Sequence, residues 1–447
     1  MVASGGNNRR FAVIGSGISG LSAAWLAARG NDVVLYEAAD RLGGHSNTAM
    51  VPTSHGEIPV DTGFIVFNDR NYPNLVALFE HLGVCTQASD MSFAASIDDG
   101  AFEYSGTGLK GLLSQRLNIV RPRFWRMLSD VLRFYREAEK LLERPDLEAL
   151  TLGDYLARER YSEAFIEDHL LPMGAAIWSM TTTDMRAYPL ESFVRFFVHH
   201  GLILLKGRPQ WRTVTGGSRE YVQRIAADFS GEIRLNSKVV SVVRTKAGVL
   251  VTDSRGHQDR FDDVMIAAHA NEALAMLADA DPMERSVLGA FRYTENIAVL
   301  HSDERLMPKR KGVWSSWNYI GGKRVDDEAP LCVTYWMNRL QNLDPRHPLF
   351  VTLNACRKID ADKVIATYRY THPLFDQAAA TAQRQLWQLQ GRRNTWFCGA
   401  HFGSGFHEDG LQAGLAAAEA ATGLRRPWQV DNESGRIFAA PLLAAAE

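Results

Sequence analysis

Three glycines near the N-terminus constrain this chain more than any other feature. Gly15, Gly17 and Gly20 follow an apolar run that begins at Phe11, and Glu37 closes the next apolar run. This order predicts a strand, a glycine turn, a helix and a second strand. Gly15 would permit the tight turn, Gly17 would let the backbone approach a pyrophosphate, and Gly20 would let helix and strand pack closely. A chance glycine turn in an α/β protein is the alternative interpretation.

The predicted helix begins with Ile18 and Ser19, whose free N–H groups would face the phosphates of a bound dinucleotide. Glu37 lies 22 residues beyond Gly15. At this distance a carboxylate can accept hydrogen bonds from a ribose hydroxyl, and it disfavours a 2′-phosphate. The segment therefore predicts a dinucleotide-binding site.

A second glycine pair, Gly43–Gly44, follows soon after Glu37 and is not expected of a nicotinamide dehydrogenase. Residues 37–45 and 61–63 resemble the extended fingerprint of FAD enzymes in the amine oxidase and phytoene desaturase superfamily. The resemblance implies that residues 41–44 wrap the cofactor and that residues 61–63 lie near the flavin. It assigns cofactor contacts to Ala38, Arg41, Gly43, Gly44, His45, Asp61, Thr62 and Gly63.

The likeness to this superfamily recurs far downstream. Residues 397–400 and 410–419 resemble its closing flavin motif, and residues 234–239 resemble the strand whose backbone meets the adenine. Residues 214–217 resemble the glycine pair that often opens that middle segment. The further contacts implied are Val239, Gly399, Gly410 and Leu411. The resemblance implies non-covalent FAD as the cofactor.

A more specific resemblance is to bacterial flavoproteins described only as predicted NAD/FAD-binding proteins. It rests on residues 207–212, 334–338 and 405–410. Such proteins are commonly associated with cyclopropane-fatty-acid-synthase-like methyltransferases, so the resemblance implies lipid acyl chemistry and a lipid methyltransferase partner. The chain has Ala400 where the closing motif usually has Glu, and no lysine can be assigned beside the flavin. Both departures count against ordinary amine oxidation.

The alternation of strand and helix patterns predicts an interleaved architecture. We expect an α/β fold in which a Rossmann-type FAD-binding domain is interleaved with an α+β substrate domain that contains a largely helical insertion. The FAD-binding domain is assigned to residues 9–95, 210–270 and 390–425. The substrate domain is assigned to residues 96–209 and 271–389. Residues 1–8 and 428–447 are expected to be loosely ordered termini.

Composition excludes several classes of protein. The chain has 447 residues, 46% of them hydrophobic and 22% charged, with a formal net charge of −2. This balance gives no general attraction to nucleic acid, and no recognition motif is present. The four cysteines lack metal-binding spacing, and we expect no metal site. The polar leader lacks the apolar core of a signal peptide, so a cytoplasmic protein is predicted, with any membrane contact peripheral and at the inner surface.

Two adjacent titratable residues are the candidates for catalysis. His407 and Glu408 precede the last predicted helix and would move protons beside the flavin. The alternative is that both only hydrogen-bond the loop backbone. Asp409 is expected to cap this helix, whose first N–H groups, at Gly410 and Leu411, would stabilise a reduced flavin. His45 is expected near the phosphates or the flavin edge, with a covalent link to the cofactor as the alternative.

The stretch from Lys110 to Arg136 is basic, aromatic and amphipathic. It contains seven Lys or Arg residues against one acid, Asp130, and apolar residues interleave with them. Such a stretch can lie on an anionic lipid surface. A core-facing helix with a solvated basic back is the alternative. Apolar residues near Trp178, Phe193 and Trp336 would either line a long pocket or form ordinary core.

These features together predict an FAD-dependent oxidoreductase that acts on the hydrocarbon portion of a fatty acyl chain. The predicted reaction is desaturation by hydride transfer to flavin, on a fatty acyl or phospholipid substrate. Three alternatives stay open: a flavin-dependent double-bond isomerase of fatty acids, an amine oxidase, and a non-catalytic FAD-binding partner of a lipid methyltransferase.

Overall fold

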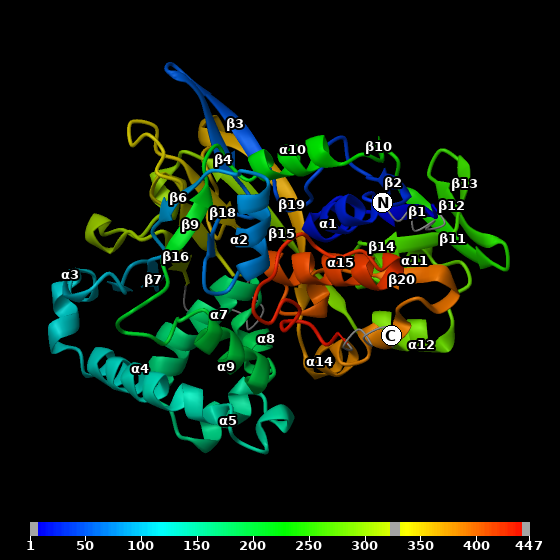
Figure 1. The fold of residues 1–447 in the computed structure, drawn as a ribbon. Coiled ribbons are helices and arrows are strands. Elements are labelled where there is room, and N and C mark those ends of the chain that lie inside the picture. Colours follow the sequence, from blue (N-terminus) through cyan, green and yellow to red (C-terminus); the bar gives the residue numbers. More distant parts are fainter. Residues whose placement is uncertain (1–7, 322–330, 440–447) are drawn as a thin grey trace.

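A computed structural model describes residues 8–321 and 331–439 (Figure 1). A five-stranded parallel sheet has the strand order β10-β2-β1-β14-β20. Its strands are β1 (Arg10–Ile14), β2 (Asp32–Tyr36), β10 (Glu232–Arg234), β14 (Asp263–Ile266) and β20 (Thr395–Phe397). The central strands are nearly continuous apolar runs because both faces of a parallel sheet are covered. The sheet draws its strands from the three separated segments that the sequence assigned to dinucleotide binding.

Two helices from opposite ends of the chain pack side by side on this sheet (Figure 1). They are α1 (Ile18–Ala27) and α15 (His407–Thr422). The contact is close because Gly414 has no side chain: a Cβ there would lie 2.2 Å from the carbonyl oxygen of Ser19. The Ser19 hydroxyl also donates to the carbonyl oxygen of Gly410 over 2.6 Å. The N-terminal turn and the C-terminal helix are thereby joined in one layer.

Smaller elements complete this half of the molecule. An antiparallel sheet of β11 (Val239–Thr245), β12 (Gly248–Asp253) and β13 (Gln258–Phe261) packs against β1 and β14. The hairpin of β3 (Thr48–Thr53) and β4 (Gly56–Asp61) projects from the body in Figure 1. Strand β9 (Trp211–Val214) pairs with β5 (Phe67–Asn68) and β6 (Thr86–Ser89). The helices here are α2 (Pro73–His81), α10 (Arg219–Asp228), α11 (Ala270–Met276), α12 (Pro282–Leu288) and α14 (Gln377–Gln383).

A seven-stranded sheet forms the second half, in the order β19-β15-β18-β17-β16-β7-β8. Its strands are β7 (Phe93–Ile97), β8 (Phe102–Ser105), β15 (Arg292–His301), β16 (Trp317–Ile320), β17 (Val333–Trp336), β18 (Phe350–Leu353) and β19 (Val364–Leu374). The pairs are antiparallel except β16 with β7. The domain boundary predicted at residue 95 therefore cuts through β7, because that strand pairs with the second sheet.

The insertion between β8 and β9 is helical. It contains α3 (Leu109–Leu112), the 3-10 helix η1 (Arg116–Val120), α4 (Pro122–Leu141), α5 (Leu152–Arg158), α6 (Glu163–Phe165), α7 (Leu171–Trp178), α8 (Thr182–Arg186) and α9 (Leu190–His199). The capping box predicted at Thr151 is present, with Asp154 N–H donating to the Thr151 hydroxyl. Short helix α13 (Met337–Leu340) follows β17.

The prediction of a loose C-terminal tail from residue 428 is wrong for residues 428–439. Trp428 stacks on Trp25, with ring centroids 5.9 Å apart, and donates to the Asn74 side chain. The guanidinium of Arg436 forms an ion pair with the buried Asp409 carboxylate at 2.7 Å. Aromatic stacking on Trp25 and the ion pair with Asp409 fix this segment to the body of the protein, although its sequence has no helical or strand periodicity. The remaining predicted loose residues, 1–7 and 440–447, lie outside the described ranges.

Candidate functional site

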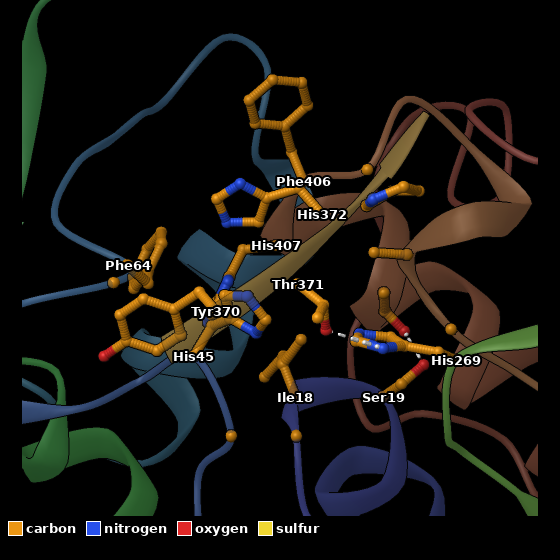
Figure 2. Close-up of a pocket in the computed structure, with 18 of the residues that line it drawn as sticks. Ile18, Ser19, His45, Phe64, His269, Tyr370, Thr371, His372, Phe406 and His407 are labelled. Carbon is orange, nitrogen blue, oxygen red and sulfur yellow. Dashed lines mark hydrogen bonds between the residues drawn. The ribbon is translucent and has the colours of Figure 1, made fainter. Parts of the chain in front are cut away.

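A single cavity of about 830 Å³ connects the glycine turn after β1 with the helical insertion. One end is lined by backbone of the turn, by the start of α1 and by the ends of β2 and β14. The other end is lined by side chains of α7, α9, β7, β16 and β17. Figure 2 shows the middle, where residues from both halves of the molecule face one another. Its size falls within the range of cofactor and small-molecule sites.

The first glycine turn has the geometry that its sequence predicts. Gly15 adopts φ +99°, and a Cβ there would lie 2.6 Å from the carbonyl oxygen of Ala267. A Cβ on Gly20 would lie 1.8 Å from the carbonyl oxygen of Gly15, so helix and turn touch at this point. A Cβ on Gly17 would meet no atom within 4 Å, although Gly17 lines the cavity. The turn is therefore packed tightly behind and open in front, as a pyrophosphate cradle requires.

Glu37 closes β2 at the same end of the cavity. Its carboxylate accepts hydrogen bonds from the N–H and hydroxyl of Ser16 and from Ala39 N–H at 2.8 Å. These contacts hold the carboxylate beside the turn, the position from which we predicted that it accepts hydrogen bonds from a ribose hydroxyl. Val239, at the start of β11, lines the same end, with Ser237 and Lys238.

The second glycine pair is folded against the first. Gly43 N–H donates to the carbonyl oxygen of Ser16 over 3.0 Å. Gly44 adopts φ +56°, and a Cβ there would lie 3.1 Å from Gly17 Cα. The two glycine segments therefore form one continuous wall. A Cβ on Gly63 would lie 2.2 Å from the carbonyl oxygen of His45, so the third predicted segment joins the same wall.

Most residues assigned to the cofactor reach the cavity, but four do not. Gly15, Gly17, Ile18, Ser19, Glu37, Ala38, Gly43, Gly44, His45, Thr62, Gly63, Val239, Gly399 and Gly410 all line it. Gly20 packs behind the turn instead. Arg41 donates to the carbonyl oxygen of Gly44 over 2.9 Å and shapes the second turn. Asp61 is buried and accepts from Ser218 N–H and the Thr48 hydroxyl. Leu411 is fully buried within α15.

The start of α15 differs from its prediction. The helix begins at His407, so Asp409 lies within its first turn and accepts from Phe406 N–H over 2.7 Å. Gly410 N–H donates to the carbonyl oxygen of Phe406 over 3.1 Å, inside the helix. The prediction that Gly410 presents one of the free N–H groups at the helix start is therefore wrong, because this N–H is already paired inside the helix. Gly410 contributes instead a surface without a side chain, close to Ile18.

Glu408 does not belong to a catalytic pair. Its side chain is fully buried and points away from the cavity toward the start of α2. There it accepts from the N–H groups of Asn74 and Leu75 and from the side-chain amide of Gln412. Burial raises the pKa of Glu408, and these hydrogen bonds oppose the rise. Its carboxylate pairs with the free N–H groups at the start of α2. This is a structural role, in line with the alternative that the residue only hydrogen-bonds backbone.

His407 lines the cavity but has a fixed set of partners. Its Nε2 lies 2.9 Å from the Ser46 hydroxyl and 2.8 Å from the Tyr221 hydroxyl. Its ring stacks on Phe64 with centroids 3.7 Å apart. Burial lowers the pKa of His407 to about 3. The imidazole is therefore neutral at pH 7.

Three further histidines meet in the middle of the cavity, and sequence reasoning singled out only His45. The ring of His45 lies 5.4 Å from that of His372 on β19 and 6.4 Å from that of His269 after β14 (Figure 2). Burial lowers the pKa of all three, that of His372 to about 4. The His269 and His372 side chains come from segments more than 200 residues beyond His45, so no local pattern could have grouped them.

The far end of the cavity is mainly apolar and aromatic, with His200 packed among the aromatic rings and its buried Nε2 without a partner in the described residues. It is lined by Met91, Phe93, Met173, Ile177, Trp178, Phe196, Leu202, Trp211, Trp317, Tyr335, Leu353, Phe375 and Phe406. Among the described residues that line the cavity, the acids are Glu37, which lies beside the glycine turn, and Glu272 on α11, whose carboxylate lies 3.6 Å from His269 Nδ1. The lysine among them, Lys238, lies at the glycine-turn end. The sequence-based pocket near Trp178 is thus present, although Phe193 lies in the core beneath it, not in the wall.

The empty space fits a flavin dinucleotide. The Gly17 position is open, the two turns form one wall, and the buried Nε2 of His45 has no hydrogen-bond partner within the described residues. An unpaired buried nitrogen on a cavity wall can be satisfied by water or by a polar group of a ligand. In the described ranges no group of three or more His, Cys, Asp or Glu side chains is placed to hold a metal ion.

Comparison with known proteins decides the family. The family model described as "Flavin containing amine oxidoreductase" matches residues 18–422. The chain belongs to this family. It is an oxidoreductase family that uses FAD, and the non-covalent FAD predicted from the sequence agrees with it. When bound, FAD supplies an acceptor for a hydride removed from a substrate.

The relatives illustrate the breadth of the fold. AofH of Mycobacterium tuberculosis, whose name places it among flavin-containing monoamine oxidases, is 27% identical over 335 residues, which is 72% of this chain and 69% of AofH. The crystal structure of a CLA-producing fatty acid isomerase from P. acnes has a TM-score of 0.67 at 16% identity and covers 94% of this chain and 99% of its own. Cyclohexylamine oxidase from Brevibacterium oxydans has a TM-score of 0.65 at 17% identity, covering 93% and 99%. The two solved structures share the fold with this chain.

Proposed function

We propose that the protein is an FAD-dependent oxidoreductase that acts on the hydrocarbon portion of a fatty acyl chain. The reaction would remove two hydrogens beside an existing double bond or methyl branch. One observation carries this proposal: the end of the cavity remote from the glycine turn is built mainly from apolar and aromatic side chains, with His200 among them and without an acid among the described residues that line it. A hydrocarbon chain is the ligand that such walls bind best.

The same observation argues against a protonated amine. An ammonium group loses several kcal/mol of hydration when it is buried, unless a carboxylate or a dense set of acceptors replaces the water. The two acids of the wall lie apart from the apolar residues, Glu37 beside the glycine turn and Glu272 beside His269. The buried histidines His45, His372 and His407 have lowered pKa values and are neutral at pH 7, so they neither attract nor repel a neutral chain.

Within this proposal His407 stays a candidate proton acceptor, although the burial that lowers its pKa also makes it a weak base. It is a neutral imidazole on the cavity wall, and the hydroxyls of Ser46 and Tyr221 at its Nε2 can pass a proton onward. His372 is the competing candidate because its ring faces His45 and it is also neutral. The pH profiles of kcat for His407→Gln and His372→Gln separate the two: the true acceptor loses its limb of the profile when it is replaced.

The proposal is tested by anaerobic reduction of the flavin. Purified holoprotein is mixed with phospholipids that carry monounsaturated or methyl-branched acyl chains, with saturated straight chains as the control, and bleaching of the flavin absorbance is followed. We expect bleaching with the first group and a product lighter by two hydrogens. Bleaching by polyamines or aromatic amines, with none by any acyl lipid, would overturn the proposal in favour of amine oxidation.

A matched pair of variants ties turnover to the apolar end. Ile177→Glu places a carboxylate in that wall, and Val364→Glu places the same charge on the exposed part of β19, outside the cavity. We expect Ile177→Glu to lower kcat/KM for acyl substrates at least tenfold because the buried carboxylate opposes a hydrocarbon. Val364→Glu should leave kcat/KM unchanged, and equal losses in both variants would contradict the placement of the chain.

A double-bond isomerase is the second candidate, because the acid-free end of the cavity suits its substrate equally well. Isomerisation returns the hydride to the same chain, so the product has the mass of the substrate and no external acceptor is consumed. Mass spectrometry therefore distinguishes the two reactions. A protein that co-purifies with a lipid methyltransferase, holds FAD and turns over no lipid would instead be a non-catalytic partner.

A further inference from the structure

Exposed apolar side chains gather on one part of the helical insertion. The large ones are Leu109, Leu117, Ile119, Val120, Trp125 and Leu132, on α3, η1 and α4. Leu109 is 76% exposed and Val120 is 71% exposed, values far from those of a packed core. We call this patch, together with its cations Lys110, Arg116 and Arg126, the α3–α4 surface. Single exposed apolar residues are ordinary, whereas a contiguous group of them marks an interaction site.

Helix α4 has two apolar faces, and only one is used by the fold. Phe124, Met127 and Phe134 are buried against the body of the protein. Trp125 and Leu132 are seven residues apart and therefore share the opposite, solvent-facing side. The Trp125 indole donates to the carbonyl oxygen of Ile119 over 2.8 Å, which joins η1 and α4 into one surface. The sequence left a core-facing helix and a membrane-facing helix as alternatives, and α4 has the residues for both.

The charge of the α3–α4 surface is positive and uncompensated. Lys110, Arg116 and Arg126 are exposed and form no ion pair with any described residue. From residue 106 to residue 129 the sequence contains no Asp or Glu. By contrast, Arg123 is paired with Asp168, and Arg133 lies near Asp130 and Glu137. The free cations are thus those that flank the exposed apolar groups.

We propose that the α3–α4 surface docks the protein on an anionic phospholipid bilayer. Apolar side chains with flanking lysine and arginine match the two layers of such a surface: the acyl boundary and the negative headgroups. The choice of a lipid bilayer as the occupant rests on the proposed function, because the proposed substrate is held in membranes. No helix in the described residues is long and apolar enough to span a membrane. The contact therefore lies in the plane of the interface.

The position of this surface connects it with the apolar end of the cavity. Phe93 lines the cavity and also packs against the cluster of Phe124 and Met127 beneath the surface. A second path runs through α9: Phe134 lies 6.4 Å from Phe193, and Phe193 lies 5.8 Å from the cavity-lining Trp178. In Figure 1, α3 and α4 lie at the edge of the molecule opposite β11–β13. Docking there would bring the acyl end of the cavity close to the lipid and leave the nucleotide end away from it.

The test is co-sedimentation of the holoprotein with phosphatidylcholine vesicles of two kinds. One kind contains about 30 mol% of the anionic lipid phosphatidylglycerol, and the other contains none. We expect binding to the anionic vesicles and its weakening by salt. The variant Lys110→Gln/Arg116→Gln/Arg126→Gln should lower the partition coefficient on the order of 100-fold, because each cation contributes about fivefold. The control Lys246→Gln/Arg285→Gln/Lys358→Gln removes three exposed cations elsewhere and should bind as the parent protein does.

An uncharged variant tests the apolar contribution. Leu109→Ser/Val120→Ser leaves the net charge unchanged and should lower the partition coefficient at least tenfold, since each side chain would lose its burial in the lipid. Flavin content and melting temperature report whether each variant is folded. Equal vesicle binding by the parent protein and the patch variants would overturn the proposal. Absence of binding by the parent protein would also overturn it and would favour a protein partner for this surface. Vesicle binding without acyl turnover would instead overturn the proposed reaction and leave the docking surface standing.

Discussion

The roles of Gly17 and Gly20 in the glycine motif can be separated by a pair of single substitutions. Gly17 adopts φ −63° and ψ 176°, a conformation that any residue can take, and a Cβ there would meet no protein atom within 4 Å. Gly17→Ala should therefore stabilise the apoprotein by about 0.4–1 kcal/mol, because alanine reduces the freedom of the unfolded chain. The new methyl group would instead occupy space on the cavity wall where a pyrophosphate approaches the turn.

The loss of affinity can be bounded from the hydrogen bonds at stake. Each bond from a backbone N–H to a charged phosphate oxygen contributes about 1.5–3 kcal/mol. Displacing one or two of them should weaken FAD binding by roughly tenfold to ten-thousandfold. Gly20→Ala, in contrast, places a Cβ 1.8 Å from the carbonyl oxygen of Gly15. Helix and turn would have to separate, at a cost of about 3 kcal/mol or more in the free energy of unfolding.

The assay compares both variants with the parent chain in the apo form. Urea unfolding followed by circular dichroism gives the stability, and quenching of FAD fluorescence on titration gives the dissociation constant. We expect Gly17→Ala to be stable and poor in FAD, and Gly20→Ala to be unstable. A Gly17→Ala protein with the FAD affinity of the parent, or one that unfolds as readily as Gly20→Ala, would refute the assignment of open space at Gly17 to the cofactor.

Three further predictions concern groups outside the cofactor wall. Glu408→Gln should lower the free energy of unfolding by about 1–3 kcal/mol and leave kcat unchanged, because the carboxylate binds the N–H groups at the start of α2. Urea unfolding and steady-state kinetics check this. A large loss of kcat without a loss of stability would restore Glu408 as a catalytic residue. Burial lowers the pKa of His169 from 6.5 to about 4, so between these values the unfolded chain binds more protons and stability rises with pH. Acidification from pH 6.5 to 4 should therefore lower the free energy of unfolding of the parent by about 3 kcal/mol more than that of His169→Gln. Parallel curves of stability against pH for the two proteins would contradict the burial of His169. Cys356 N–H donates to Cys332 Sγ over 3.3 Å, so mild peroxide should join the two thiols in a disulfide with release of water. Peptide mapping by mass spectrometry would detect the disulfide as a loss of two hydrogens. Two separately alkylated thiols after the same treatment would exclude the disulfide.

Local sequence was sufficient wherever one short segment does the work. The spacing of Gly15, Gly17, Gly20 and Glu37 predicted the strand, turn, helix and acid that the structure contains, because each backbone demand is met by neighbours a few residues away. The same holds for the capping box at Thr151. The last helix shows the limit: Asp409 suits an N-cap, but the structure has Phe406 in that place, and Asp409 accepts from its N–H within the first turn.

The assignment of Glu408 failed for a tertiary reason. Adjacent residues on a helix point about 100° apart, and in this helix His407 faces the cavity whereas Glu408 faces α2. The sequence shows two titratable neighbours, but only the position of α2 reveals that Glu408 meets the N–H groups of Asn74 and Leu75. The tail after residue 428 was missed in the same way, because the partner of Arg436 is an acid buried in another element.

The sequence by itself determined that this chain builds a Rossmann-type dinucleotide site, since the glycine turns depend on backbone conformations that few residues other than glycine permit. Tertiary structure alone decided the character of the space beyond that site. His45, His269 and His372 meet there from three distant segments, and the apolar end is assembled from a helical insertion and a second sheet. Side chains at helical or strand spacing look alike whether they fill a core or line a cavity, and only the packing of the elements around them separates the two.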